Sequence, residues 1–176
     1  MRSPDAHSRQ DGDTVEVREL QRTPTAVRRG RVAVAELPRW LGDAYRDVMT
    51  YLGTVGAAPA GPPFACYERV DAGFQVEAGF PVTASVPGNG RVHPSSLPGG
   101  RAVVVWHRGP DDGLAAAYAD AEAEVERLGG LPSELPWETY HTGPDTDPSE
   151  HVTEVVQPYR LGSPGRAHVT GAAGPA

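Results

Sequence analysis

The stretch TEVVQPY, Thr153–Tyr159, repeats the pattern of an earlier stretch, VEAGFPV, Val76–Val82. Each is a short apolar run with a glutamate, Glu154 or Glu77, four residues before a proline. Apolar runs of this length that end at proline predict β-strands. A glutamate within such a strand either faces water, as most glutamates do, or belongs to a site that uses its charge.

Two further pairs of stretches match in the same order along the chain. VRRG (Val27–Gly30) matches WHRG (Trp106–Gly109), and PFACY (Pro63–Tyr67) matches PWETY (Pro136–Tyr140). Between them the pattern alternates strand, helix, strand, strand, twice. The sequence therefore predicts an α+β fold of two βαββ units related by a pseudo-twofold axis, with antiparallel sheets and two main helices. The helices are expected over residues 37–56 and 110–130.

The ends of the chain differ in composition from its middle. Residues 1–12 are polar, and residues 161–176 are rich in glycine, alanine and proline. We therefore predict a disordered N-terminus over 1–12, one folded domain over 13–160 and a disordered tail over 161–176. The two halves of the domain would cover about 13–90 and 100–160, with a long loop over residues 85–100.

Composition excludes several classes of partner. The net charge is −7, which argues against direct binding to nucleic acid, because phosphate recognition needs a basic face. No apolar run approaches the length of a transmembrane helix, so we expect no membrane partner. The single cysteine, Cys66, permits no internal disulfide and favours a cytoplasmic protein. Histidines and carboxylates show no ligand spacing, and we expect neither a metal nor a cofactor.

The stretches GGRAVVVWHRGP (Gly99–Pro110), PWETY and TEVVQPY together resemble the GyrI-like (gyrase-inhibitor-like) small-molecule-binding domain. In many AraC-type and MerR-type multidrug-sensing regulators this domain is the effector-binding module. The resemblance covers about residues 14–159. No helix-turn-helix segment precedes it, so the chain looks like a stand-alone member, and direct transcriptional control is not expected.

The resemblance implies a pocket in a central cleft between the two halves. In the family a glutamate on the closing strand lies at the bottom of an aromatic-lined pocket, and Glu154 matches that position. Glu77 is its twofold mate. Glu138 is a third carboxylate; it alternates with Trp137, so one of these two faces the pocket or the helix layer, and the sequence leaves open which. The expected ligand-binding residues are Glu154, Trp137, Tyr140, Phe80, Trp106, Trp40, Tyr45, Met49, Glu138 and Glu77.

The resemblance implies three functions with which these residues are compatible. The first is binding of lipophilic, mainly cationic aromatic molecules, as in multidrug sequestration, sensing or resistance, because a carboxylate among aromatic rings attracts diffuse cations. The second is a hydrolase that opens activated cyclopropane rings of DNA-alkylating natural products, with Glu154 as general acid or base. The third is a protein-partner module of the gyrase-inhibitor type, whose partner the sequence does not identify. The structural alternative is that Glu154 faces water and the aromatic residues fill the core.

Overall fold

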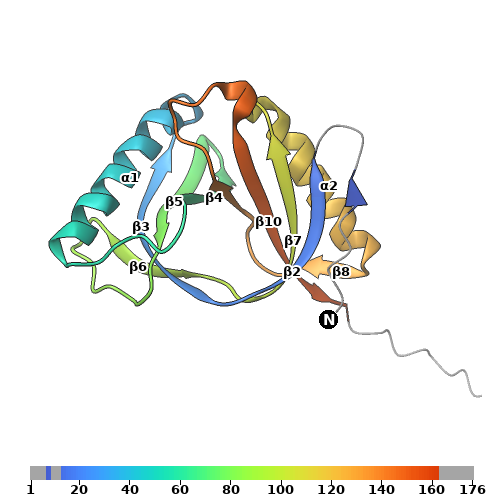
Figure 1. Ribbon diagram of the computed structural model, residues 1–176, viewed down its shortest axis with the longest axis horizontal. Helices are drawn as coiled ribbons and strands as arrows, with labels where there is room; N and C mark the ends of the chain where they lie inside the picture. The colour runs from blue at the N-terminus through green and yellow to red at the C-terminus, as the bar shows by residue number, and fades with distance from the viewer. Residues whose placement is uncertain (1–6, 9–12, 163–176) are drawn as a thin grey trace, which may run out of the picture.

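A computed structural model describes residues 7–8 and 13–162 of the chain (Figure 1). The predicted disordered ends therefore lie mainly outside the described residues. Within them, His7–Ser8 form a short strand that pairs with the next strand, and the last strand continues to Leu161. Neither of the two long helices in this part of the chain is long and apolar enough to cross a membrane.

The elements follow the predicted order, with additional strands. The helices are α1 (Leu37–Thr54) and α2 (Leu114–Arg127), and each begins after a single 3₁₀ turn, η1 (Val34–Glu36) or η2 (Asp111–Gly113). A third 3₁₀ turn, η3 (Pro148–Glu150), precedes the last strand. The strands are β1 (His7–Ser8), β2 (Thr14–Leu20), β3 (Thr23–Val32), β4 (Phe64–Val70), β5 (Gly73–Pro81), β6 (His93–Leu97), β7 (Gly100–Arg108), β8 (Gly130–Pro132), β9 (Trp137–Tyr140) and β10 (Val152–Leu161).

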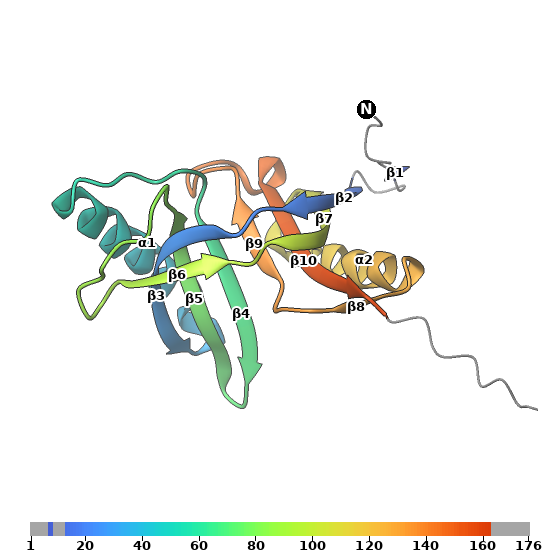
Figure 2. The same cartoon turned by 90° about the horizontal axis from the view of Figure 1, so that it is seen from below.

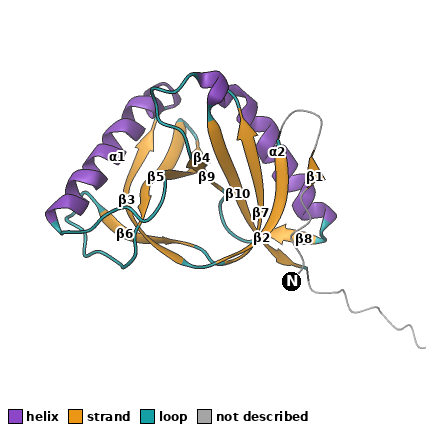
Figure 3. Ribbon diagram, in the orientation of Figure 1, coloured by secondary structure: helices purple, strands orange, loops and turns teal. Residues whose placement is uncertain are grey.

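One curled antiparallel sheet carries both halves of the fold. Its strands are hydrogen-bonded in the order β1-β2-β7-β10-β9-β4-β5-β3-β6, and β8 pairs with the end of β10. The order is symmetric about the contact between β9 and β4: β10 corresponds to β5, β7 to β3, and β2 to β6. α1 and α2 flank the sheet in the same symmetric way (Figures 1 and 3). The predicted duplicated βαββ fold is thus confirmed.

The strand register places the pseudo-twofold axis between two residues. Ala65 on β4 lies opposite Glu138 on β9, and these two positions are equivalent in PFACY and PWETY. Glu77 lies opposite Cys66, and Glu154 lies opposite Thr139, the equivalent of Cys66. The predicted equivalence of Glu77 and Glu154 is therefore confirmed.

The register corrects one of the sequence matches. Glu77 pairs with Arg29 on β3, and Glu154 pairs with Trp106 on β7. Trp106 is therefore equivalent to Arg29 and not to Val27, as the match of VRRG with WHRG implied. A slip of two residues keeps every side chain on its own face of the sheet, so the alternation of the sequence does not reveal it.

The outer strand of each half comes from the neighbouring half. β2 pairs with β7 but leads into β3, and β6 pairs with β3 but leads into β7. The β2–β3 and β6–β7 connections therefore both pass from one half to the other, and they run side by side (Figure 2). Where they cross, a Cβ on Gly99 would lie 2.7 Å from the backbone nitrogen of Arg22, so glycine is needed. β6 lies within the predicted loop 85–100; its sequence, HPSSL, lacks the apolar alternation that predicts a strand.

Both helices pack on the same face of the sheet. Val48 and Leu52 of α1 pack on the outer part of the first half, and Ala44 packs toward the centre. Ala121 and Val125 of α2 pack on the second half. A separate core fills the opposite, helix-free face: Val27, Phe64, Ala102, Val104, Trp137 and Val156. The periodicity of α1 also placed Met49 in the buried stripe, but Met49 is 46% exposed at the edge of that stripe.

Candidate functional site

The central contact between β4 and β9 carries different chemistry on its two faces. Successive side chains of a strand alternate between faces, so Glu138 points toward the helices and Trp137 points away from them. Ala65, opposite Glu138, belongs to the core beneath α1. The question that the sequence left open is thereby answered: Glu138 faces the helix layer at the pseudo-twofold axis.

Phenol groups surround the Glu138 carboxylate. Tyr118 of α2 donates a hydrogen bond to Oε1 at 2.7 Å, and Tyr140 of β9 donates one to Oε2 at 2.7 Å. The hydroxyl of Tyr140 is in turn 2.7 Å from that of Tyr67 on β4. On the side of α1, Tyr45 donates to the main-chain oxygen of Phe64 at 3.2 Å.

The tyrosines form two pseudo-symmetric pairs. Tyr67 and Tyr140 occupy the same place in PFACY and PWETY. Tyr45 and Tyr118 correspond through their helices, because the same spacing relates the buried residues of α1 to those of α2. The contacts of the two pairs differ at the axis. Tyr118 meets a carboxylate there, whereas Tyr45 meets Ala65 and bonds to a backbone carbonyl instead.

Glu138 is a buried acid without a cationic partner. Glu138 is only 8% exposed, and no arginine or histidine among residues 13–162 forms an ion pair with it. Burial raises the pKa of Glu138, and the hydrogen bonds from Tyr140 and Tyr118 only partly oppose this increase. Burial and the nearby carboxylate also raise the pKa of Tyr118 and of Tyr140, so these phenols stay protonated as donors.

Glu154 lies on the opposite, helix-free face and already has partners. It is 7% exposed, and its Oε1 accepts a hydrogen bond from Arg18 Nη1 at 2.7 Å. Its Oε2 lies 2.8 Å from His141 Nε2. Arg18 also pairs with Glu16. This carboxylate is therefore compensated within the protein, unlike that of Glu138.

Trp106 adjoins this network without facing an open site. Its indole N–H donates to Glu16 Oε1 at 2.9 Å, and the guanidinium of Arg18 lies 5.5 Å from its ring centre. His141 lies against the same ring, with centres 4.9 Å apart. The twofold mate of Glu154, Glu77, is ion-paired with Arg29 at 2.7 Å and accepts from Ser95 at 2.8 Å.

The residues predicted to bind ligand thus divide between two faces of the sheet. Glu138, Tyr140, Tyr45 and Phe80 lie on the helix side, where the rings of Tyr45 and Phe80 meet edge to face at 5.7 Å. The helix-free side carries Glu154, Glu77, Trp106 and Trp137. Trp40 packs between α1 and β3 over Gly30, and Met49 is exposed. The structure does not bring the ten residues together into one pocket.

Sequence reasoning did not include Tyr67 and Tyr118 in the site. The signal for Tyr67 is its equivalence to Tyr140 in the matched stretches. Tyr118 can be found only by aligning the two helices on their buried positions, since their lengths differ and their sequences share little else.

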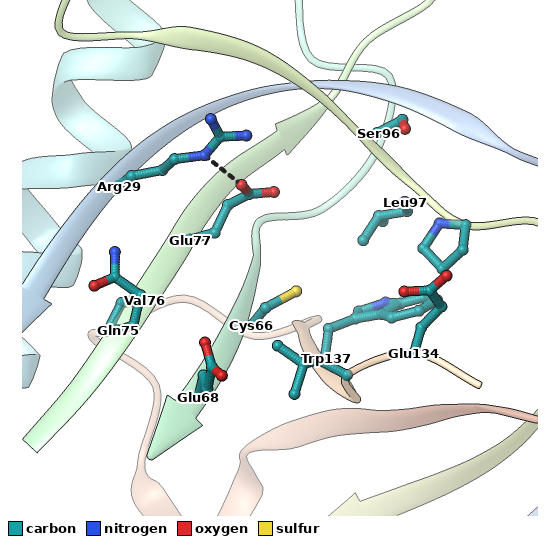
Figure 4. Close-up of a pocket in the computed structure, with 12 residues that line it drawn as sticks. Arg29, Cys66, Glu68, Gln75, Val76, Glu77, Ser96, Leu97, Glu134 and Trp137 are labelled. Carbon is teal, nitrogen blue, oxygen red and sulfur yellow. Dashed lines mark hydrogen bonds and ion pairs between the residues drawn. The ribbon is translucent and has the colours of Figure 1, made fainter. Parts of the chain in front are cut away.

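A second feature that was not predicted is a cavity of about 290 Å³ on the helix-free face, beside Trp137 (Figure 4).

Comparison with known proteins places the fold. The sequence of residues 14–160 matches the family described as the GyrI-like small molecule binding domain. No curated protein matches the chain in sequence. Among solved structures, the C-terminal domain of EcmrR superimposes with a TM-score of 0.69 at 23% identity, covering 84% of this chain and 97% of that domain.

Other structures share the fold at lower identity or greater length. EcmrR in its complex with DNA gives a TM-score of 0.72 at 23% identity and covers 85% of this chain, which spans 58% of that one. A hydrolase from Listeria innocua gives 0.62 at 12% identity, covering 83% of this chain and 91% of that one. SAV2435 bound to tetraphenylphosphonium gives 0.50 at 11% identity, covering 83% and 93%. With the sequence match extending over nearly all of the described domain, the chain belongs to the family of GyrI-like small molecule binding domains.

Proposed function

We propose that the chain binds lipophilic, mainly cationic aromatic molecules, and that Glu138 provides the negative charge of the site. The observation that carries the proposal is a buried carboxylate that lies among four phenol rings and has no cation beside it within residues 13–162. A buried charge without a partner is costly, so the protein retains it at the expense of stability. A cationic ligand would remove that cost.

The surroundings of Glu138 favour a particular kind of cation. Aromatic ring faces attract positive charge, and they do so most strongly where water is excluded. A large organic cation with diffuse charge loses little hydration on entry, whereas an inorganic ion loses much. Phenol rings and one central charge fix few details of the ligand, so the site would accept many such molecules. The ligand named for SAV2435, tetraphenylphosphonium, is of this class.

The same reasoning favours Glu138 over Glu154 as the ligand's partner. Arg18 and His141 already engage both oxygens of Glu154. A cation arriving there would have to displace Arg18, which would itself lose a partly buried ion pair. Glu138 offers its charge without such a competitor, since its present partners are neutral phenols that can turn their hydroxyl hydrogens away.

Titration calorimetry at pH 7.5 tests the proposal by measuring how tightly tetraphenylphosphonium binds to the wild type, to Glu138→Gln and to Glu154→Gln. Glu138→Gln keeps the shape and removes the charge, and it should weaken binding by about 1–3 kcal/mol, which is roughly ten- to a hundredfold. The matched control Glu154→Gln should bind like the wild type. Neutral triphenylphosphine oxide should bind Glu138→Gln and the wild type alike. Equal binding of the cation to Glu138→Gln and wild type would contradict the proposal.

A hydrolase is the second candidate, because the same carboxyl is suited to proton transfer. Burial raises the pKa of Glu138, which favours the protonated carboxyl more than in an exposed glutamate, and this form can donate its proton to a substrate oxygen as a cyclopropane ring opens. Water would then add to the ring carbon and give up a proton. Incubation with an activated cyclopropane compound should yield a product heavier by one water molecule, and Glu138→Gln should abolish it. If the wild type leaves the compound unchanged, this candidate fails.

A further inference from the structure

The cavity on the helix-free face lies away from the Glu138 cluster. Its floor is formed by Trp137 and Cys66, which are paired across β9 and β4, and its walls include Leu97 and Leu135 (Figure 4). Trp137 is adjacent to Glu138 on β9, so its side chain points to the other face. The cavity therefore belongs neither to the proposed cation site nor to the Arg18–Glu154 network.

Carboxylates surround this apolar floor. Glu68, Glu77 and Glu134 all line the cavity, while Arg29 is the one basic residue among the lining side chains. Arg29 is ion-paired with Glu77 at 2.7 Å. Within residues 13–162, Glu68 and Glu134 have no basic partner. The mouth of the cavity thus holds a surplus of negative charge over a hydrophobic base.

Trp137 adds an unused polar group to the floor. The residue is only 4% exposed and lines the cavity (Figure 4), and none of the described residues accepts a hydrogen bond from its indole N–H, whose nitrogen is not fully buried. A donor that opens into the cavity can bond to water, and a ligand with an oxygen acceptor can take the place of that water. The aromatic face and the free donor sit together, which suits a ring that bears an oxygen atom.

We propose that this cavity is a second small-molecule site, which takes a small aromatic ammonium that carries an oxygen acceptor. The ring would stack on Trp137, the oxygen would accept the indole hydrogen bond, and the ammonium would lie near Glu68 and Glu134. A volume of about 290 Å³ suits one ring with a short side chain better than the large lipophilic cations proposed for Glu138. Anionic ligands are disfavoured by the surplus of carboxylates.

Binding in this cavity is non-covalent. Cys66 lines the floor, but burial raises the pKa of its thiol to about 12, and Glu77 and Glu138 add to the effect. The thiol is therefore protonated at neutral pH and is a poor nucleophile. Its role is to supply apolar surface beside the indole ring.

The three tryptophans of the chain make the proposal measurable by NMR. Each gives one indole N–H signal, and Trp→Phe variants assign them. We use tyramine as the probe and tyrosol, in which a hydroxyl replaces the ammonium, as its neutral counterpart. Tyramine should shift the Trp137 signal along a saturating curve, while those of Trp40 and Trp106 stay in place. Tyrosol should bind roughly two- to tenfold more weakly, because two exposed carboxylates each add little.

Three variants separate this site from the first. Glu68→Gln/Glu134→Gln should reduce tyramine affinity to that of tyrosol, and Cys66→Leu, which fills the floor, should abolish binding of both. Glu138→Gln should leave tyramine binding unchanged, whether or not that variant still binds large cations. The proposal is overturned if tyramine leaves the Trp137 signal in place. Equal affinity for tyramine and tyrosol, or loss of tyramine binding in Glu138→Gln, would also overturn it.

Discussion

Replacing Glu138 with glutamine should make the unliganded protein more stable at neutral pH. The carboxylate is 8% exposed and accepts two phenol hydrogen bonds. Such bonds to a charged group contribute roughly 1.5–3 kcal/mol each, against a desolvation penalty of several kcal/mol. Because the pKa of Glu138 is raised, the penalty is the larger of the two. We expect glutamine to stabilise the fold by about 1 kcal/mol, and so to raise Tm by about 2–4 °C for a domain of this size.

The gain should depend on pH in a defined direction. The folded protein holds the Glu138 proton more tightly than the unfolded chain does, so the wild type loses stability as pH rises through the ordinary glutamate range toward the raised pKa. Below that range the carboxyl is neutral in both states, and Glu138→Gln should match the wild type. Thermal melts followed by circular dichroism between pH 4 and 8 measure the difference.

The control is Glu154→Gln, which removes a buried charge that has partners. Loss of its ion pair with Arg18 should lower stability at pH 7. Opposite signs for the two variants are the expected outcome. A Glu138→Gln protein that is less stable than the wild type at pH 8 would refute the reasoning, because it would mean that the phenols more than compensate the charge.

Two further predictions concern buried positions. Ala65→Glu should place a second carboxylate opposite Glu138 at a fully buried site and destabilise the protein by roughly 2–4 kcal/mol. Denaturant unfolding at pH 8 should show a larger loss of stability than for Ala65→Gln, which has the same size without the charge. Equal losses of stability would argue against a charge effect. Val48→Asp should lower the free energy of unfolding by roughly 3 kcal/mol or more, because it buries an unpaired charge between α1 and the sheet. Met49→Asp, at the exposed neighbouring residue, should leave the denaturant midpoint of unfolding nearly unchanged. Similar losses of stability in the two variants would mean that this face of α1 is not packed.

The duplicated fold was predictable because local sequence patterns indicate its strands and helices. Valine-rich runs, prolines and helical spacing recur in both halves, and the same order of matches reveals the repeat. β6 was missed because a strand that gains its hydrogen bonds from β3 needs no apolar alternation of its own. The sequence also gives no sign of the crossing that brings β2 beside β7.

The site was only partly predictable, because its decisive contacts join distant parts of the chain. Alternation shows that Trp137 and Glu138 point in opposite directions, but not which of them faces the helices. Arg18, which compensates Glu154, lies 136 residues away from it in sequence. No local sequence pattern predicts that pairing. Sequence reasoning therefore placed Glu154, which matches the family's pocket glutamate, at the centre of the site in place of Glu138.

The position of Glu138 on the pseudo-twofold axis bears on why the two halves share one chain. In a dimer of identical half-size subunits, any residue at this place would occur twice, directly across the strand pair. Two carboxylates there would repel each other and compete for one proton. Joining the halves covalently allows one copy to carry glutamate at this position while the other carries Ala65. A lone central charge is thus a property that only a fused and diverged repeat can possess.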